Sequence, residues 1–311
     1  QWGLIDPVDT PDGGNVGFHK HMAISTHITS GYSKFPMIDW LDNNLPYMKL
    51  EECQPSYLHG ACKLFVNGTW IGIIESPVES VRFLKKNRRH ALIPVMTSIS
   101  WTINTNEIQI FTDGGRLCRP VYFIDENKKP SYDKPAIMEK IMSGAFTWNN
   151  LITGFASKRE YGKNKLYSLK DLYSTDDFQK LEGTGAIVDY IDTSEEENLL
   201  IASKEELLEK NPRYTNLEIH PSLLLGVMGN QIVFPENNQL PRDLFACGQA
   251  KQAVSLYHSN YLSRIDKMGV VLNYGQVPLV KSRYMEYINH EQHPYGENCI
   301  VAIGVYGSYN V

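Results

Sequence analysis

The histidines and cysteines of this 311-residue sequence lack the spacing of a metal site or of a disulfide framework. No HExxH or HxxxH pattern occurs among the histidines, which gives no support to a zinc enzyme. The five cysteines are scattered, and none forms a CxxC pair. Their default state is the reduced thiol of a cytosolic or nuclear protein. We therefore expect the sequon that begins at Asn67 to be unmodified.

Long apolar runs and the signatures of common enzyme classes are missing as well. No apolar run approaches the ~20 residues that a membrane-spanning helix needs. GxSxG, the Walker A motif and GxGxxG are absent, so no hydrolase elbow, P-loop or dinucleotide site is indicated. The sequence begins Gln1-Trp2 without an initiator Met, a signal peptide or a transit peptide, and we expect a piece of a longer chain.

The net charge of −5 is unevenly distributed along the sequence. Residues 160–218 carry fourteen acidic and seven basic side chains, whereas residues 237–290 carry six basic and three acidic ones. Binding to nucleic acid depends on cations that neutralise phosphates, so the whole-chain charge alone would argue against it. The pattern predicts an acidic lobe and a separate, mildly basic working face.

Apolar periodicity predicts a chain rich in strands, with one long helix. Residues 64–74 predict a hairpin whose Asn67-Gly68 turn suits type I′ geometry. A helix is expected over residues 77–90, and a longer one over about 241–268, with Pro241 in its first turn. The remaining expectations are strands at 96–101, 107–111, 119–124 and 298–305, two apolar runs at 186–188 and 199–202, and short helices and loops over 125–180.

Eight peptides along the sequence resemble one family, in one order. The first reads WGLIDPVDTPDGGNVG and the third begins IFTDGGR. Together they lie at residues 2–17, 65–70, 110–120, 188–197, 218–222, 235–242, 251–253 and 296–303. They resemble the second-largest, β-like subunit of multisubunit DNA-directed RNA polymerases. One such peptide would be weak evidence, but eight in order make the resemblance strong.

The resemblance implies a fold class and a division into domains. It implies a mixed α/β, β-rich, multidomain fragment of an RNA polymerase β-like subunit. Residues 1–44 would end the fork domain, 45–118 form the first external domain, 119–228 the second, and 229–311 begin the hybrid-binding domain.

The start of the helix at Pro241 is the candidate substrate site. An arginine in a first helical turn adds a cation to free N–H groups and the positive helix end, which together suit a triphosphate. At 100° per residue, Arg242, Phe245, Gln249 and Gln252 form one stripe. The resemblance implies that Arg242 faces nucleotide phosphates and that Gln252 touches the RNA end. Further expected contacts to the RNA–DNA hybrid or its 3′ end come from Gln239, Phe245, Gln249 and Lys251.

One departure from the family and one alternative interpretation concern this helix. Phe245 replaces a tyrosine common in eukaryotic relatives, so no role that needs a hydroxyl group is expected there. Without the resemblance, the same residues describe a capped, solvent-facing helix start with an ordinary core helix behind it.

The loop Asp9-Thr10-Pro11-Asp12-Gly13 carries two carboxylates, which could ligate a metal ion or act as a general acid–base pair. We favour a turn in which Asp side chains accept bonds from their own backbone. By resemblance the loop shapes the fork near the active centre and binds no metal. Lys20, just behind it, is a candidate nucleic-acid contact or a solvated surface lysine.

The basic run over residues 85–89 has three interpretations. It would serve as a phosphate contact, as a localisation signal or as a solvated helix end, and we favour the last.

The resemblance also implies partners and cofactors. Catalytic and magnesium-binding residues are expected outside this chain, with Mg²⁺ in the assembled active centre and no cofactor of the chain's own. Expected partners are the largest subunit, small assembly subunits, template DNA, nascent RNA and nucleoside triphosphate, with no membrane. An assembly scaffold without substrate contact is the alternative function. Residues 8–17 look viral, which predicts a cytoplasmic viral factory or virion; otherwise we expect a nuclear protein.

Overall fold

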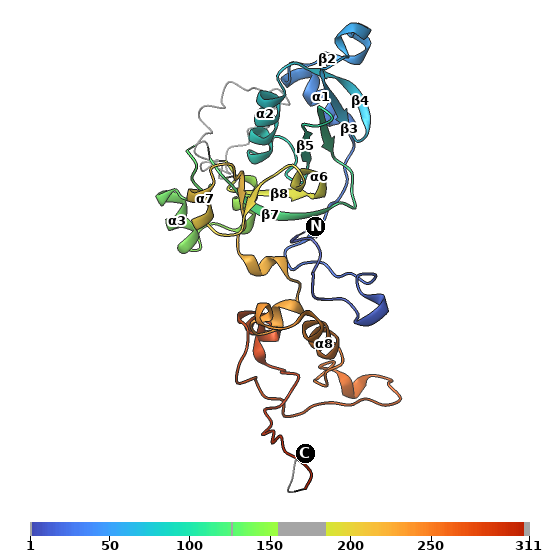
Figure 1. Ribbon diagram of the computed structural model, residues 1–311, viewed down its shortest axis with the longest axis vertical. Helices are drawn as coiled ribbons and strands as arrows, with labels where there is room; N and C mark the ends of the chain where they lie inside the picture. The colour runs from blue at the N-terminus through green and yellow to red at the C-terminus, as the bar shows by residue number, and fades with distance from the viewer. Residues whose placement is uncertain (1, 126, 155–184, 308–311) are drawn as a thin grey trace. The chain divides into compact units, whose positions relative to one another are not determined.

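The computed structural model describes residues 2–125, 127–154 and 185–307. The chain divides into two compact units (Figure 1). Unit 1 comprises Ser25–Leu223, and unit 2 comprises Trp2–Ile24 together with Leu224–Val311. The first residues of the chain therefore pack with the last third of it.

The first sheet of unit 1 has five strands in the order β2-β4-β3-β6-β5. The strands are β2 (Met48–Lys49), β3 (Cys62–Val66), β4 (Thr69–Ile74), β5 (Ser98–Thr102) and β6 (Glu107–Phe111). β3 and β6 pair in parallel, and the other neighbours pair antiparallel. The predicted hairpin is confirmed, since Asn67 and Gly68 both have the positive φ angles, 48° and 75°, that a type I′ turn requires.

Alternating apolar side chains place the main core on one face of this sheet. Cys62, Leu64 and Val66 of β3 are buried beside Ile108 and Ile110 of β6. Helices α1 (Phe35–Asn44) and α2 (Pro77–Arg89) add further large side chains to this core, which are Met37, Trp40, Leu41 and Leu84. The predicted helix over residues 77–90 is confirmed.

Gly72 lets β2 approach β4 closely. It lies opposite Lys49 in the antiparallel pair. A Cβ atom on Gly72 would lie 2.2 Å from the carbonyl oxygen of Met48. A larger residue would therefore push β2 off the sheet.

The second sheet of unit 1 is built around β7 (Leu117–Phe123). It runs β1-β7-β10-β9, and β8 also pairs with β7. These short strands are β1 (His27–Ile28), β8 (Val188–Asp192), β9 (Ile201–Ala202) and β10 (Asn216–Leu217). The described residues of this region include the helices α3 (Pro135–Met142), α4 (Trp148–Thr153), α6 (Thr193–Glu196) and α7 (Glu206–Lys210). The short helices expected over residues 125–180 are thus found as α3 and α4, and residues 155–180 of that expectation lie outside the described residues.

The basic run at the end of α2 is mostly internal, so the interpretation as a solvated helix end is wrong. Arg88 is 2% exposed, and its two terminal nitrogens donate to the two carboxylate oxygens of Glu195 at 2.7 and 3.0 Å. Lys85 lies 3.0 Å from the same carboxylate, and Arg89 pairs with the buried Asp189 at 2.7 Å. The acidic segment around α6, distant in sequence, supplies these partners, which local patterning could not reveal.

Unit 2 has little regular structure besides α8 (Leu240–Ala250) and short 3-10 turns. These turns include Gly13–Asn15, Gly229–Gln231, Pro235–Asn237, Tyr261–Ser263, Arg283–Tyr287 and Asn289–Glu291. The helix expected to reach residue 268 ends at Ala250, and that prediction was wrong over its second half. The segment that follows contains Val254, Ser255 and Asn260, which favour a helix weakly, and exposes Leu262 and Ile265 instead of packing them.

The strand expected over residues 298–305 is also absent from the structure. A strand needs a neighbouring strand for its backbone groups, and the described part of the chain pairs none with this segment. Its apolar side chains are exposed, with Ile300 and Ile303 almost fully so. Within the described residues, no helix has the length and apolar character to cross a membrane.

We predict that Glu195→Gln lowers the free energy of unfolding of unit 1 by about 3–5 kcal/mol, because the buried Arg88 loses its bidentate partner and keeps only the more distant Asp189 at 3.6 Å. Urea unfolding followed by tryptophan fluorescence measures this, since Trp40, Trp70, Trp101 and Trp148 lie in unit 1. The exposed Glu197 is the control, and Glu197→Gln should change the value by less than about 0.5 kcal/mol. Equal, small effects would contradict the prediction.

The same network sets the pH dependence of stability. Burial alone would raise the pKa of Asp189, but the Arg89 and Arg88 guanidiniums lower it to about 2. Arg88 and Lys85 likewise lower the pKa of Glu195 against its burial. A lowered folded-state pKa stabilises the protein above the unfolded pKa, so stability should fall as the pH drops from about 4 to about 2. Glu195→Gln should flatten this fall.

Candidate functional site

The loop predicted at residues 9–13 is closed at its base by a short antiparallel contact. Ile5 and Met22 form an isolated bridge. The backbone N–H of Asp6 donates to the carbonyl of His21 at 2.8 Å, and that of Ala23 donates to Leu4 at 3.0 Å. The two arms of the loop are thereby held opposite each other, with the Asp9–Asp12 stretch on one arm and the His19–His21 stretch on the other.

The side chain of Asp6 anchors this base. It is buried, and its Oδ1 accepts from the backbone N–H of Val8 at 3.0 Å. Gly226 and Gly229 lie so close that a Cβ on Gly226 would be 2.6 Å from Oδ2 of Asp6. Burial raises the pKa of Asp6, opposed by backbone hydrogen bonds. The Asp side chain that bonds its own turn is thus Asp6.

Helix α8 presents two faces. Asp243, Leu244 and Cys247 are buried, whereas Arg242, Phe245 and Gln249 are exposed. The exposed stripe predicted from the helical period is therefore present over these three residues. Gln252, the fourth member of the predicted stripe, follows the end of the helix and is exposed.

Loop and helix together enclose a pocket of about 470 Å³ in unit 2. From the loop arms it is lined by Asp9, Thr10, Pro11, Asp12, His19 and His21. From α8 and the residues after it, the lining comprises Leu244, Phe245, Gly248, Gln249, Lys251 and Gln252. Eight of the predicted site residues are thus brought into one concavity, although about 240 residues separate the two segments.

An ion pair joins the two walls of the pocket. The ammonium group of Lys251 lies 2.6 Å from Oδ1 of Asp9, whose side chain is only 8% exposed. Nε2 of His21 lies 3.6 Å from the same oxygen and 3.3 Å from the Lys251 nitrogen. For Asp9, the expectation of a bond to its own backbone is wrong, since its carboxylate pairs with Lys251. The negative charge of Asp9 in turn compensates the positive charge of Lys251.

The threonine of the loop holds the far end of the turn. The backbone N–H of Gly17 donates to Oγ1 of Thr10 at 2.8 Å. Gly13 begins the 3-10 turn Gly13–Asn15 with a φ of 83°, a left-handed value that glycine tolerates best. Gly13 does not line the pocket, and neither does the exposed Lys20.

Arg242 lies outside the pocket lining, on the exposed face of α8. Among the residues that the structure describes, no carboxylate forms an ion pair with its guanidinium. Its Cζ lies 5.7 Å from the centre of the Phe245 ring, a cation–π distance that links it to the pocket wall. Gln239, the N-cap of α8, is exposed one turn before it.

Four pocket residues were missed from the sequence. Leu244 and Gly248 follow from helical spacing, since they lie beside Phe245 and Gln249 on α8. His19 and His21 follow from the closure of the loop, because the Ile5–Met22 bridge sets their arm opposite Asp9. Cys247 lies behind the pocket wall, and burial, reinforced by Asp9 and Asp6, raises the pKa of its thiol to about 12. It is therefore no nucleophile at neutral pH.

The pocket does not fit a divalent metal ion. Its two carboxylates are Asp9, which Lys251 already compensates, and Asp12 on the exposed tip. Within the described ranges, no group of three or more His, Cys, Asp or Glu side chains could hold a metal ion. The pocket residues offer amide groups and a flat ring, and Arg242 beside the pocket adds a positive charge.

Comparison with protein families finds three successive matches, each to one domain of the same protein. Residues 1–28 match the family described as RNA polymerase Rpb2, domain 3, and residues 64–125 match Rpb2 domain 4. Residues 228–311 match Rpb2 domain 6. Both walls of the pocket thus lie in matched segments.

Curated relatives align with essentially the whole chain. RNA polymerase II subunit 2 of Arabidopsis thaliana is 34% identical over 100% of this chain. Subunit RPB2 of Encephalitozoon cuniculi is 32% identical over 99%, and RNA polymerase subunit 2 of Acanthamoeba polyphaga mimivirus is 31% identical over 98%. The chain spans about a quarter of the length of these relatives. The order of the domain matches and the extent of these alignments show that the chain belongs to the family of second-largest subunits of DNA-directed RNA polymerase.

Proposed function

We propose that this chain forms part of the wall of an RNA polymerase active centre, where it contacts the incoming nucleotide and the RNA–DNA hybrid. The observation that supports this most is the exposed guanidinium of Arg242, which pairs with no carboxylate of the described residues and lies beside the pocket that the loop and α8 share. The relatives are named DNA-directed RNA polymerase subunits, which supports nucleotidyl transfer as the reaction of the assembled enzyme.

In this proposal Arg242 binds the phosphates of the nucleotide. A guanidinium is a permanent cation with several donors, and it stands in the first turn of α8, where the helix dipole adds positive potential. Phe245 offers a ring face to a base or a sugar, and Gln239, Gln249 and Gln252 offer amides. The residues hold and orient substrate, which is the main protein contribution to phosphoryl transfer.

For Lys251 we propose a different role from the expected contact to the hybrid. Because Asp9 compensates its charge, Lys251 attracts phosphate less than a free lysine would. We assign to the pair the task of holding the loop Asp9–Gly13 against the end of α8. The nucleic acid then meets a wall of fixed shape.

Magnesium and partners belong to the assembled enzyme in this proposal. Mg²⁺ would be held outside this chain, since the pocket does not fit a metal ion. The largest subunit, the small assembly subunits, template DNA and nascent RNA are its proposed partners, and the chain alone would be inactive. The domain division at residues 44/45, 118/119 and 228/229 stays a prediction.

The source of the polymerase is also a proposal. The relatives include polymerase II subunits and a mimivirus subunit at similar identity. On the residues of the first loop we favour a viral enzyme, working in a cytoplasmic viral factory or virion, over a nuclear one.

One observation favours a scaffold function in addition. Large apolar side chains of unit 2 are almost fully exposed, among them Leu262, Ile265, Ile300 and Ile303. Exposed apolar surface of this extent marks a binding face for other protein. The segment after α8 would therefore be covered in the assembly.

We predict that Arg242→Ala, made in the parent subunit of the assembled polymerase, lowers kcat/KM for nucleotide addition by about tenfold to a hundredfold. Loss of a charge-assisted contact to phosphate is the reason. Single-nucleotide extension of a preformed RNA–DNA scaffold, measured over a range of nucleotide concentrations, gives the value.

Arg213→Ala is the matched control, because Arg213 is an exposed arginine of unit 1. The control should extend RNA at the unchanged rate. Wild-type kinetics of the Arg242 variant would leave only the scaffold function.

We predict that Asp9→Asn and Lys251→Met impair extension to a similar degree, and that the double variant is no worse than either single one. Partners in one ion pair lose the same interaction once, so their effects are not additive. The same extension assay measures it. If Lys251→Met alone were harmful, Lys251 would contact nucleic acid directly and the pair would have no positioning role.

A further inference from the structure

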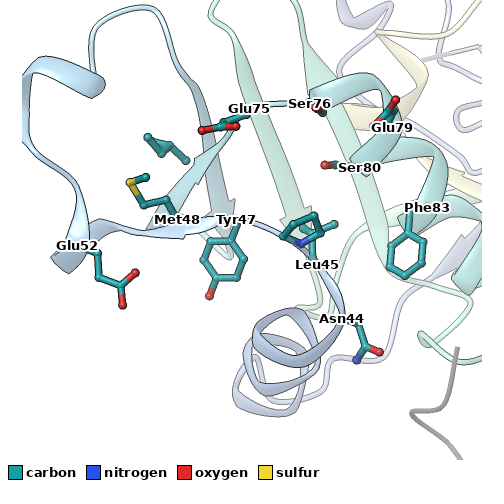
Figure 2. A pocket seen from close by; sticks show the side chains of 12 residues that line it. Asn44, Leu45, Tyr47, Met48, Glu52, Glu75, Ser76, Glu79, Ser80 and Phe83 are labelled. Atoms are coloured by element: carbon teal, nitrogen blue, oxygen red, sulfur yellow. The ribbon is translucent and has the colours of Figure 1, made fainter.

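A second pocket, of about 640 Å³, lies in unit 1 (Figure 2). It is lined by Asn44, Leu45, Pro46, Tyr47, Met48, Glu52, Ile73, Glu75, Ser76, Glu79, Ser80 and Phe83. These residues come from the end of α1, from β2 and the turn after it, from the end of β4 and from the first turns of α2. None of them belongs to the proposed nucleotide site.

The floor of this pocket is apolar and well supported. Ile73 and Leu45 are buried beneath it, and Met48 and Tyr47 are half-buried on β2 and just before it. Phe83 stacks on Trp40 of the core, with ring centres 6.0 Å apart. The close approach of β2 to β4 at Gly72 fixes the strand that carries Met48. The floor is thus part of the folded core of unit 1.

The rim of the pocket is acidic. Glu52, Glu75 and Glu79 are exposed, and Figure 2 shows their carboxylates spaced around the floor. The twelve lining residues include no lysine or arginine. Within the described part of the chain, none of the three carboxylates forms an ion pair, and Lys49 of β2 is held by Asp42 at 2.7 Å. The rim therefore carries three carboxylates outside any described ion pair, and Lys49, already paired with Asp42, acts on Glu52 only through space.

Local structure accounts for only one of these acids. Glu79 lies in the first turn of α2, where a carboxylate is stabilised by the positive helix end. Glu52 ends a 3-10 turn and Glu75 follows β4, and neither position has a structural need for negative charge. Tyr47 donates its hydroxyl to Asp42, and burial together with Asp42 raises the pKa of this phenol, so the ring side remains for the pocket.

We propose that this pocket binds a basic, amphipathic segment of a partner protein. Apolar side chains of that segment would lie on Met48, Tyr47 and Phe83, and its arginine or lysine side chains would reach Glu52, Glu75 and Glu79. Long basic side chains suit such a site, since their aliphatic stems cover apolar surface while the charge meets the rim. The negative charge of the rim disfavours binding of nucleic-acid phosphates. The volume of the pocket suits a few side chains.

Two labelled peptides test the proposal on the full chain by fluorescence anisotropy. One alternates arginine and leucine, and the other alternates arginine and serine at the same length and charge. We expect the arginine–leucine peptide to bind, and the arginine–serine peptide to bind at least about tenfold more weakly. The reason is that leucine side chains bury apolar surface on the floor of the pocket and serine side chains do not. Equal binding of both peptides would overturn the proposal.

The variant Glu52→Gln, Glu75→Gln, Glu79→Gln should weaken the arginine–leucine peptide by about tenfold. The control removes three exposed acids elsewhere in unit 1, as Glu197→Gln, Glu206→Gln, Glu209→Gln, and should leave the affinity unchanged. Circular dichroism confirms that both triple variants are folded. If the control weakened binding as much as the pocket variant, the peptide would sense total charge only, and the proposal would fail.

Discussion

The ion pair between Asp9 and Lys251 is the contact on which the arrangement of unit 2 depends. It joins a loop near the start of the chain to the residue that follows α8, at 2.6 Å and with the carboxylate almost fully buried. Asp6 adds a second anchor, because its buried carboxyl group lies against Gly226 and Gly229. With the loop held at both points, the Asp9–Asp12 stretch and the exposed face of α8 become two walls of one pocket. A unit with so little regular structure needs contacts of this kind to have a defined surface.

Buried ion pairs also hold unit 1 together, where they connect helices and strands of its two sheets. Its two sheets are short-stranded, and buried ion pairs connect elements that hydrogen bonding between strands does not join. Arg88 on α2 reaches Glu195 on α6, and Arg119 on β7 reaches Glu218 and Glu196 at 2.7 and 2.8 Å. Such pairs cost desolvation, and they repay it only when the geometry is complete. They therefore fix which elements pack together more than they add to stability.

Local patterns in the sequence were sufficient for some features. The hairpin at Asn67-Gly68 depends on two positive φ angles, and the exposed stripe of Arg242, Phe245 and Gln249 depends on the helical repeat. Both properties are set within a few residues. Family resemblance suggested the proposed role of Arg242 and correctly indicated the family, neither of which periodicity contains.

Other features depend on partners that lie far away in the sequence. The run at residues 85–89 was expected in solvent because its acidic partners, Asp189 and Glu195, lie about a hundred residues later. The helix predicted to residue 268 ends at Ala250, since weak helix formers follow and no apolar surface in the described chain covers them. The segment predicted as a strand at 298–305 finds no neighbouring strand among the described residues, and a strand depends on such a partner. Asp9 was predicted to bond the backbone of its own loop, whereas its carboxylate pairs with Lys251, about 240 residues away.

The most direct measurement is photo-crosslinking of a nucleotide with a photoreactive group on its γ-phosphate to the assembled polymerase. Mass spectrometry then locates the label within this chain. The account predicts label at the start of α8, on or beside Arg242, and its loss in Arg242→Ala. Label confined to unit 1, or a yield at α8 that does not depend on Arg242, would contradict it.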